Sequence, residues 1–468
     1  MSINSENVQE YVSSLFTRAR AAQKQIENYT QEQVDTLCKA IARATTKPEN
    51  VKAIGTMCFE EGGMGDQESK FVKLNTRVKG VCWDIRNDKT VGVLEELPAR
   101  GLVKIARPVG VIGCLIPSTQ PDVTAIIKAM FAIKGRNASV YSPHPKLQKS
   151  TLLTCEIIRQ ALKKHGAPED LIICAENPTI AMSNEIMKRA DLVVATGGAP
   201  MVRAAYSSGT PAYGAGAGNA NVIVDETADI KATATLLVNS KFFDQSSGCS
   251  CENSIIVNDQ VYDELIRELK ANGSYMVTGA EKLLLQKTIW PEWPNNHNLN
   301  RDIVVKPATT IAKIAGFNLP ESTKLILVEE TGTGSQYAFA GEKLCPVLAV
   351  YKYSDFDDAI RIIQENQEYQ GLGHSCGIHT NRDDRVMKLA QTVKTTRVAV
   401  RQAMTASNSG SWTSGNRWTS TLGCGTWAGN IVSENITTHH FINTTWISRP
   451  IPAYIPTDEE LFGDLVND

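Results

Sequence analysis

The chain has 468 residues, of which 42% are apolar and 21% charged, and its formal net charge at pH 7 is -2. This composition excludes a largely disordered chain, and a charge so near zero gives no general attraction to nucleic acid or to an anionic membrane. A chain of this length exceeds what one hydrophobic core usually holds, so the sequence predicts two or three lobes.

The N-terminal thirty residues are predicted to form a helix of the mature protein and not a targeting segment. Val8, Val12, Leu15 and Phe16 follow helical spacing, and acidic residues occur where a signal peptide would be basic. No apolar run approaches the roughly 20 residues that cross a bilayer. Eleven scattered cysteines fit reduced thiols better than a disulfide framework. We therefore expect a cytoplasmic protein with no nucleic-acid or membrane partner.

Strand-like and helix-like segments alternate from about residue 103 to 225, at the spacing typical of parallel βαβ units. The pattern predicts a doubly wound parallel sheet whose ligands bind beyond the carboxyl ends of its strands. The expected strands are 109–117, 137–143, 169–176 and 191–196, and the expected helices are 121–135, 150–166 and 179–190.

Two glycine-rich stretches follow this alternation. An apolar strand runs into Gly197 and Gly198, and a helix then opens with Pro200 in its first turn and ends at Gly209. Free backbone N–H groups at that helix start suit a dinucleotide pyrophosphate, although a plain tight turn explains the glycines equally well. The glycines of "YGAGAGNANVIV" precede a strand and not a helix, so we expect close approach of backbone or ligand there and no phosphate loop.

A second lobe is predicted to begin near Asp225, with a helix over 228–243 and, later, a strand that leads into a helix capped near Asp355. The segment from Arg401 to Gly429 is rich in Ser, Thr, Gly and Trp and contains no acid. That composition indicates a long functional loop.

The stretch "SSGCSCENSIIV" places Cys249 and Cys251 directly before a predicted strand. A zinc site needs about four ligands and this pair supplies two, so no metal site is predicted. A nucleophilic thiol beside a cofactor lobe and a pair of buried inert thiols are both compatible with the pattern.

Several long motifs together resemble the aldehyde dehydrogenase superfamily, and more narrowly its coenzyme A-acylating branch. They are "RPVGVIGCLIPSTQP", "SPHPK", "VVATGGAPMVRAAYSSG", "GCSCENSIIV", "EKLCPVLAVYKYSDFDDAI", "GLGHSCGIHT" and "TLGCGTWAGN". The resemblance implies an α/β, aldehyde dehydrogenase-like fold with two doubly wound parallel-sheet lobes and an oligomerisation hairpin.

The resemblance also implies a division of the chain. A cofactor-binding domain is expected over residues 1–225, with 430–456 returning to it or to an oligomerisation sheet, and a catalytic domain over 226–429. Residues 91–108 and 437–456 are the candidate oligomerisation strands, and we expect a homo-dimer or homo-tetramer. The chain shows no amphipathic N-terminal tail like that of microcompartment-targeted relatives, which adds to the expectation of a cytoplasmic enzyme.

By the same resemblance, Cys249 is the nucleophile and Cys251 a structural thiol. The backbone N–H of Cys249 and the side chain of Thr119 are expected at the oxyanion, although Gln120 stands where related sequences usually carry Asn. His374 lies in a stretch that the branch shares, and a purely structural histidine is the alternative. The cofactor, NAD or NADP, is expected at Thr196, Gly197, Gly198 and Glu342, with its adenosine end at Ser142 and His144, where coenzyme A would also bind.

Hydrolytic aldehyde dehydrogenases carry a water-activating glutamate at the position of Ala215. Without that base the acyl-enzyme should wait for a better nucleophile, such as the thiol of coenzyme A. The implied reaction is oxidation of a short-chain aldehyde to acyl-CoA through a cysteine thioester. The alternatives are a hydrolytic aldehyde dehydrogenase and a catalytically silent dinucleotide-binding relative.

Two arginines of the acid-free loop bear on the aldehyde itself. Arg401 and Arg417 are candidates to admit an anionic aldehyde such as sulfoacetaldehyde through charge-assisted hydrogen bonds. The alternative is that both are solvated or structural.

Overall fold

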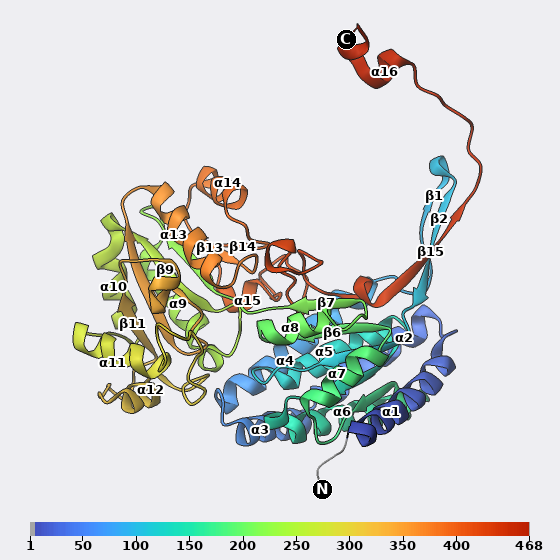
Figure 1. Ribbon diagram of the computed structural model, residues 1–468, viewed down its shortest axis with the longest axis horizontal. Coiled ribbons are helices and arrows are strands. Elements are labelled where there is room, and N and C mark those ends of the chain that lie inside the picture. The colour runs from blue at the N-terminus through green and yellow to red at the C-terminus, as the bar shows by residue number, and fades with distance from the viewer. Residues whose placement is uncertain (1–4, 468) are drawn as a thin grey trace.

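The computed structural model describes residues 5–467, which form two parallel sheets with helices on their faces and a small antiparallel sheet that projects from them (Figure 1). No helix of this described part is long and apolar enough to cross a membrane. The predicted α/β fold with two parallel-sheet lobes is confirmed.

The first lobe is built on a five-stranded parallel sheet of order β5-β4-β3-β6-β7. Helices α2 to α6 cover one face, while α1 and α7 lie on the other and α8 packs on β6 and β7. The strands are β3 (Val111–Leu115), β4 (Ala138–Ser142), β5 (Ile172–Cys174), β6 (Leu192–Thr196) and β7 (Ala212–Ala215). The helices are α1 (Ser5–Ile26), α2 (Gln31–Thr45), α3 (Pro48–Gly62), α4 (Gln67–Asp84), α5 (Pro121–Lys134), α6 (Gln148–Lys164), α7 (Ile180–Arg189) and α8 (Ala199–Tyr206).

The second lobe contains a seven-stranded parallel sheet of order β10-β11-β12-β9-β8-β13-β14. Alternate side chains of its strands enter two different cores: Ile223 and Ile256 pack on one face, and Val222 and Ile255 on the other. The strands are β8 (Ala220–Val224), β9 (Glu252–Asn258), β10 (Ser274–Met276), β11 (Leu325–Glu329), β12 (Val347–Tyr353), β13 (Cys376–His379) and β14 (Val398–Val400). The helices are α9 (Ile230–Phe242), α10 (Tyr262–Ala271), α11 (Gly279–Ile289), α12 (Ala308–Ala315), α13 (Phe356–Tyr369), α14 (Asp383–Thr392) and α15 (Met404–Ser407).

The predicted boundary at residue 225 needs a correction. Strand β8 ends at Val224 but pairs with β9 and β13, so it belongs to the seven-stranded sheet. The chain therefore passes from one sheet to the other between Ala215 and Ala220. The sequence pattern missed this because β7 and β8 both read as apolar strands separated by a short glycine-rich link.

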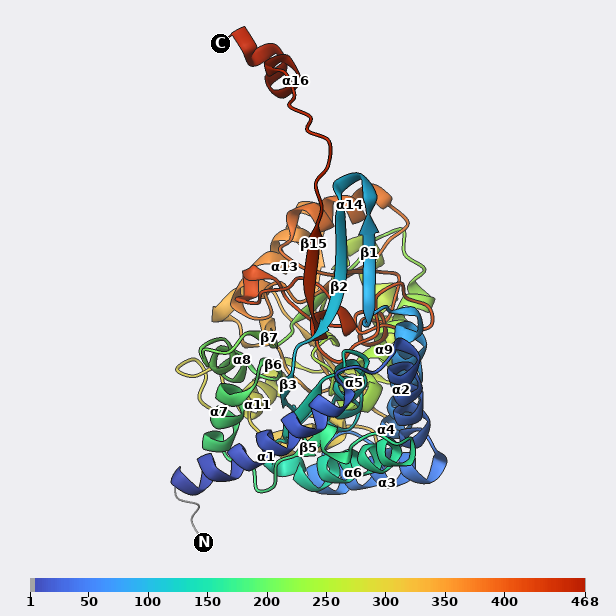
Figure 2. The same ribbon diagram turned by 90° about the vertical axis from the view of Figure 1, so that its right-hand side faces the viewer.

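The third sheet forms an arm. Strands β1 (Gly92–Leu97), β2 (Leu102–Pro108) and β15 (Ile442–Ser448) pair antiparallel in the order β1-β2-β15 and stand away from both lobes (Figure 2). The chain then continues beyond the arm to α16 (Asp458–Phe462), which lies clear of the body in both views. Residues 91–108 thus form the predicted hairpin, and within 437–456 the strand is confined to β15.

The order of the strands brings opposite edges of the two large sheets together. Residues that follow β3, β4 and β6 lie at the carboxyl edge of the first sheet, while residues that precede β9, β12 and β13 lie at the amino edge of the second. The carboxyl edge of the first sheet is where the sequence pattern predicted a ligand crevice. The amino edge of the second sheet is where the predicted nucleophile lies.

Candidate active site

Cys249 and His374 are in contact. The turn that follows α9 presents Cys249 just before β9, and its Sγ lies 3.2 Å from Nε2 of His374, which precedes β13. The imidazole is fully buried, and its Nδ1 lies 2.9 Å from the Ser375 hydroxyl. The sequence left open whether His374 is a structural residue or a site residue. The structure places its imidazole beside the sulfur atom of Cys249.

Both members of this pair are neutral at pH 7. Burial, with Arg397 nearby, lowers the pKa of His374 to about 3. Burial also raises the pKa of the Cys249 thiol to about 12, and the Glu342 carboxyl adds to that rise when it is ionised. A neutral imidazole beside a protonated thiol is arranged to accept the thiol proton when the sulfur attacks.

The backbone before Cys249 forms a left-handed turn of three non-glycine residues. Asp244, Gln245 and Ser246 have φ angles of 47°, 52° and 65°. Each such residue costs on the order of 1 kcal/mol or more and persists where its surroundings fix it. The nucleophile is therefore presented by a strained turn.

A buried ion cluster fixes that turn. The Asp244 carboxylate accepts from Nζ of Lys73 at 2.8 Å and Nζ of Lys70 at 3.2 Å, and from the Ser247 hydroxyl at 2.8 Å. The backbone N–H of Asp66 donates to it at 3.1 Å. Burial alone would raise the pKa of Asp244, but Lys73 and Lys70 hold it below its ordinary value. The carboxylate is thus charged and fully engaged.

Gly218 lies at the centre of the site, as expected for a glycine that permits close approach. A Cβ at this position would lie 1.8 Å from the carbonyl oxygen of Cys249 and 3.3 Å from His374 Nε2. Its N–H donates to Oε1 of Glu342 at 3.1 Å, and burial raises the pKa of Glu342 to about 8. Any side chain here would displace the nucleophile, so only glycine fits.

The turn after β6 has the features that a dinucleotide phosphate needs. Gly198 and Ala199 are exposed at the start of α8, and a Cβ on Gly197 would lie 2.8 Å from Met201 Sδ. The hydroxyl of Thr196 lies 2.8 Å from that of Thr421. An open helix start without side chains in front of it accepts an anion.

The residues expected at the adenosine end lie farther along the same edge, after β4. The Ser142 hydroxyl lies 2.8 Å from that of Ser183, and His144 Nδ1 accepts the N–H of Lys146 at 3.2 Å. Burial lowers the pKa of His144, and the cations Lys146 and Arg301 lower it further. With the β6 turn, these residues form an extended edge that fits a dinucleotide.

The loop after β3 brings Gln120 close to the turn of the nucleophile. Nε2 of Gln120 lies 3.4 Å from where a Cβ on Gly248 would be. The residue that departs from the pattern of related sequences therefore lies beside the turn of Cys249, and the oxyanion role of Thr119 stays a prediction.

Two other expectations concern residues around the nucleophile. Ala215, where hydrolytic enzymes carry a glutamate, is buried at the end of β7 and pairs with Thr196. Cys251 is buried, and its Sγ lies 3.6 Å from Nζ of Lys241 and 3.8 Å from the carbonyl oxygen of Ser246. It packs as a structural thiol, as the resemblance implied.

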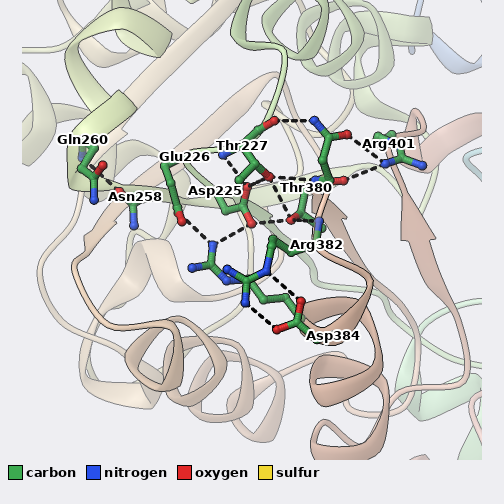
Figure 3. Close-up of polar contacts among 11 residues, drawn as sticks. Asp225, Glu226, Thr227, Asn258, Gln260, Thr380, Arg382, Asp384 and Arg401 are labelled. Carbon is green, nitrogen blue, oxygen red and sulfur yellow. Dashed lines mark hydrogen bonds and ion pairs between the residues drawn. The ribbon is translucent and has the colours of Figure 1, made fainter.

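The assignment of Arg401 to the substrate is wrong. Val400 is in register with Ile256 through β13 and β8, so Arg401 lies at the carboxyl edge of the second sheet, opposite to Cys249. Its guanidinium donates to the carbonyl oxygen of Thr380 at 2.9 Å and to Asn381 at 3.0 Å (Figure 3). The parallel strand direction places this end of β14 away from the reaction.

Arg417 is also engaged elsewhere, at the end of α4. Its Nε and one terminal nitrogen each lie 2.7 Å from a carboxylate, that of Asp84 and that of Asp88. Two acids already balance this cation, so its role is structural. Both carboxylates are distant in sequence from the loop, which explains why the loop composition alone gave no sign of them.

Some site residues gave no signal in the motifs. Arg397 is buried and donates to the carbonyl oxygens of His374 at 2.8 Å and Gly423 at 2.9 Å, so it fixes the histidine loop. Lys70, Lys73 and Arg77 recur on one face of α4, a spacing that reads as a solvated charged face. This spacing is the sequence feature that could have indicated a role for the three residues, because it places all three cations on one side of α4.

A possible metal-binding group lies outside this site. Glu434, His439 and His440 each offer a ligand atom, and these atoms lie within 4.8 Å of one another. Both Nε2 atoms already contact Glu434 Oε1, at 3.0 Å and 3.3 Å. We assign it no metal role.

A nucleophilic cysteine between a dinucleotide-type edge and a buried histidine is the arrangement of an aldehyde dehydrogenase. Residues 4–320 match the aldehyde dehydrogenase family, and the chain belongs to this family. It is 44% identical to the sulfoacetaldehyde dehydrogenase (acylating) of Bilophila wadsworthia, over 97% of this chain and 98% of that one.

Solved structures agree. An acetylating aldehyde dehydrogenase from Geobacillus thermoglucosidasius superposes with a TM-score of 0.92 at 35% identity, covering 97% of this chain and 99% of that chain. The propionaldehyde dehydrogenase of Rhodopseudomonas palustris, solved with bound CoA and an acylated cysteine, gives 0.82 at 27% identity, covering 94% and 97%. The predicted resemblance to the acylating branch is confirmed.

Replacement of Asp244 by Asn should destabilise the fold by about 3 to 5 kcal/mol, because it leaves Lys70 and Lys73 buried without their carboxylate. Urea unfolding followed by circular dichroism measures this loss. Asp384→Asn, which breaks an exposed pair with Arg382, is the matched control and should have no measurable effect. Equal stability of the two variants would contradict the role of the cluster.

Alkylation of Cys249 by iodoacetamide should accelerate about tenfold per pH unit from about pH 7 to pH 10, because the thiolate fraction grows throughout this range when the thiol pKa is about 12. Mass spectrometry of the peptide that contains Cys249 gives the rate. A plateau reached below about pH 8 would instead indicate a thiolate–imidazolium pair and contradict the neutral pair described above.

Proposed function

We propose that the protein oxidises a short-chain aldehyde to acyl-CoA with NAD or NADP, through a thioester on Cys249, and catalyses the reverse reaction with the same groups. The observation that carries this proposal is the 3.2 Å contact between Cys249 Sγ and the neutral, buried His374. The acylating relatives support the choice of coenzyme A as the acyl acceptor.

The first step is addition of Cys249 to the aldehyde. As the C–S bond forms, the thiol proton passes from Sγ to Nε2 of His374, and Nδ1 donates to the Ser375 hydroxyl. Negative charge develops on the aldehyde oxygen, where we place the backbone N–H of Cys249 and Nε2 of Gln120 as donors. Gln120 thus joins Thr119 as a candidate side-chain donor.

A bound nicotinamide supplies the two-electron oxidation that turns the thiohemiacetal into a thioester. We assign its phosphates to the turn of Thr196, Gly197 and Gly198, its ribose to Glu342 and its adenosine end to Ser142 and His144. The protonated form of Glu342 is favoured by burial, and a carboxyl group in either form can hydrogen-bond a ribose hydroxyl.

The second step transfers the acyl group. His374 first releases to solvent the proton that it took from Cys249. It then accepts the proton of the coenzyme A thiol, and the new thiolate attacks the thioester carbon. The bond to Cys249 breaks as His374 returns the proton to the leaving sulfur, which releases acyl-CoA and restores the cysteine thiol. Ala215 offers no base to water, because its side chain is a methyl group. The lack of a base favours the thiol, the stronger nucleophile, over water as the acceptor.

Wild-type protein with an aldehyde and NAD should form about one equivalent of NADH per site without coenzyme A and turn over continuously with it. Stopped-flow absorbance at the NADH band measures both phases. Cys249→Ala should abolish the burst, whereas the matched variant Cys251→Ala should keep it. Sustained NADH formation without coenzyme A would instead support the hydrolytic alternative, and no NADH under any condition would support the silent one.

We also propose that the arm is a subunit contact and that the protein is a homo-dimer or homo-tetramer in the cytoplasm. Trp446 and Ile447 on β15, and Ile451, Tyr454 and Ile455 after it, are exposed on the arm and its continuation. Apolar side chains gathered on a projecting sheet are typical of an interface. Eleven unpaired thiols suit a reducing compartment.

Trp446→Glu should lower the molar mass in solution, because it puts a charge in the proposed contact. Light scattering coupled to size-exclusion chromatography measures the mass. Leu283→Glu, which changes an exposed apolar residue of α11 far from the arm, should leave the assembly intact. A monomeric wild-type protein, or an unchanged Trp446→Glu variant, would contradict the proposal.

A further inference from the structure

A cavity of about 270 Å³ lies between α4, the end of α9 and the loop from Ala403 to Trp418. Its wall is mostly apolar or hydroxylic, from residues such as Val72, Phe243 and Thr405. Two cations, Lys73 and Arg77, also line it. The volume suits an aldehyde of a few carbon atoms, because one water occupies roughly 30 Å³ in the liquid.

The two lining cations differ in how they are balanced. Lys73 lies 2.8 Å from Asp244 and 3.8 Å from Asp122, so two carboxylates share its charge. Arg77 donates to the hydroxyl of Ser409 and, at 3.0 Å, to the carbonyl oxygen of Thr405. Within residues 5–467 the hydrogen-bond partners of Arg77 are these neutral oxygens, and they use two of its five N–H donors.

The group as a whole carries an excess positive charge. Lys70, Lys73 and Arg77 contribute three cations, while Asp122 and Asp244 contribute two carboxylates. A buried charge without a counter-ion is costly, and the cost falls when a ligand brings the opposite charge. The uncompensated charge lies on Arg77, at the cavity wall.

The cavity lies beside the turn that presents the nucleophile. Phe243 lines it and directly precedes the strained turn, and Lys73 lines it while holding Asp244. Burial lowers the pKa of Arg77. Through Phe243 and Lys73, the wall of the cavity extends from Arg77 to the turn that presents Cys249.

We propose that Arg77 is the specificity-determining residue of the aldehyde site and binds the anionic terminal group, a sulfonate or a carboxylate, of a short aldehyde whose carbonyl reaches Cys249. This inference rests on the proposed function and names its substrate class. The planar guanidinium offers two parallel N–H groups to two oxygens of such an anion. The apolar wall accommodates the carbon chain.

The test compares an anionic and a neutral aldehyde in the presence of NAD and coenzyme A. In Arg77→Gln, kcat/KM for sulfoacetaldehyde should fall about 10- to 100-fold, mainly through KM, the loss expected for a charged hydrogen-bonded contact. Propionaldehyde, which lacks the anion, should change less than about threefold. Arg77→Lys should restore part of the loss, because it keeps the charge without the planar fork.

Arg401→Gln is the matched control, since it removes an equal charge at the opposite edge of the sheet. It should leave both aldehydes unaffected. An equal fall for both aldehydes in Arg77→Gln, or no fall for sulfoacetaldehyde, would overturn the inference. If Arg77→Gln does not fold, Arg77→Lys with the same pair of aldehydes gives the same comparison.

A binding measurement separates this inference from the proposed function. Ethanesulfonate has the anion but no carbonyl, and calorimetry should detect its binding to wild-type protein and not to Arg77→Gln. Wild-type protein that forms no acyl-CoA from either aldehyde but binds ethanesulfonate through Arg77 would refute the reaction and keep the anion site. If the wild-type protein turns over propionaldehyde, but the wild-type protein and Arg77→Gln bind ethanesulfonate equally well, the anion site alone would be refuted.

Discussion

The buried contact between Asp244 and the two lysines of α4 is the constraint on which the site depends. Three consecutive residues before the nucleophile adopt left-handed backbone angles that side chains disfavour, at a total cost of several kcal/mol. The ion cluster, through hydrogen bonds to both lysines and to Ser247, holds this turn. Since α4 belongs to the first lobe and the turn to the second, the same contact also sets the distance between Cys249 and the cofactor edge.

The two sheet edges that meet at the site supply different groups. The carboxyl edge of the first sheet offers backbone N–H groups and small residues, which suit a phosphate-bearing cofactor. The amino edge of the second sheet offers the side chains of Cys249, His374 and Glu342, which come from loops before three different strands. Gly218 lies on the link between the sheets and lets these groups approach one another.

The local elements were the most predictable part. The apolar run that became β6, the paired glycines after it and the cap at Asp355 follow rules that act within a few residues. The prediction that a strand follows Cys249 and Cys251 is confirmed, since β9 begins at Glu252. The boundary at residue 225 was wrong because membership of a sheet depends on pairing with distant strands.

Side-chain roles were less predictable, because they depend on which groups meet across the fold. Arg401 and Arg417 stand in a loop of suitable composition, but one lies at the far edge of the sheet and the other is neutralised by Asp84 and Asp88. Arg77 stands in an ordinary helical charge pattern, and its position beside a cavity follows only from the packing of α4 against α9 and the loop after α15.

The neutral state of the resting cysteine has a consequence for the durability of the protein. Oxidants such as peroxide attack thiolates, and the products beyond the sulfenic acid are not reversed by ordinary thiols. With a pKa of about 12, the Cys249 thiol is protonated at pH 7. In the proposed reaction the sulfur becomes a strong nucleophile when His374 takes its proton during attack on a carbonyl, so we expect Cys249 to react with substrate and to resist oxidation in the absence of substrate.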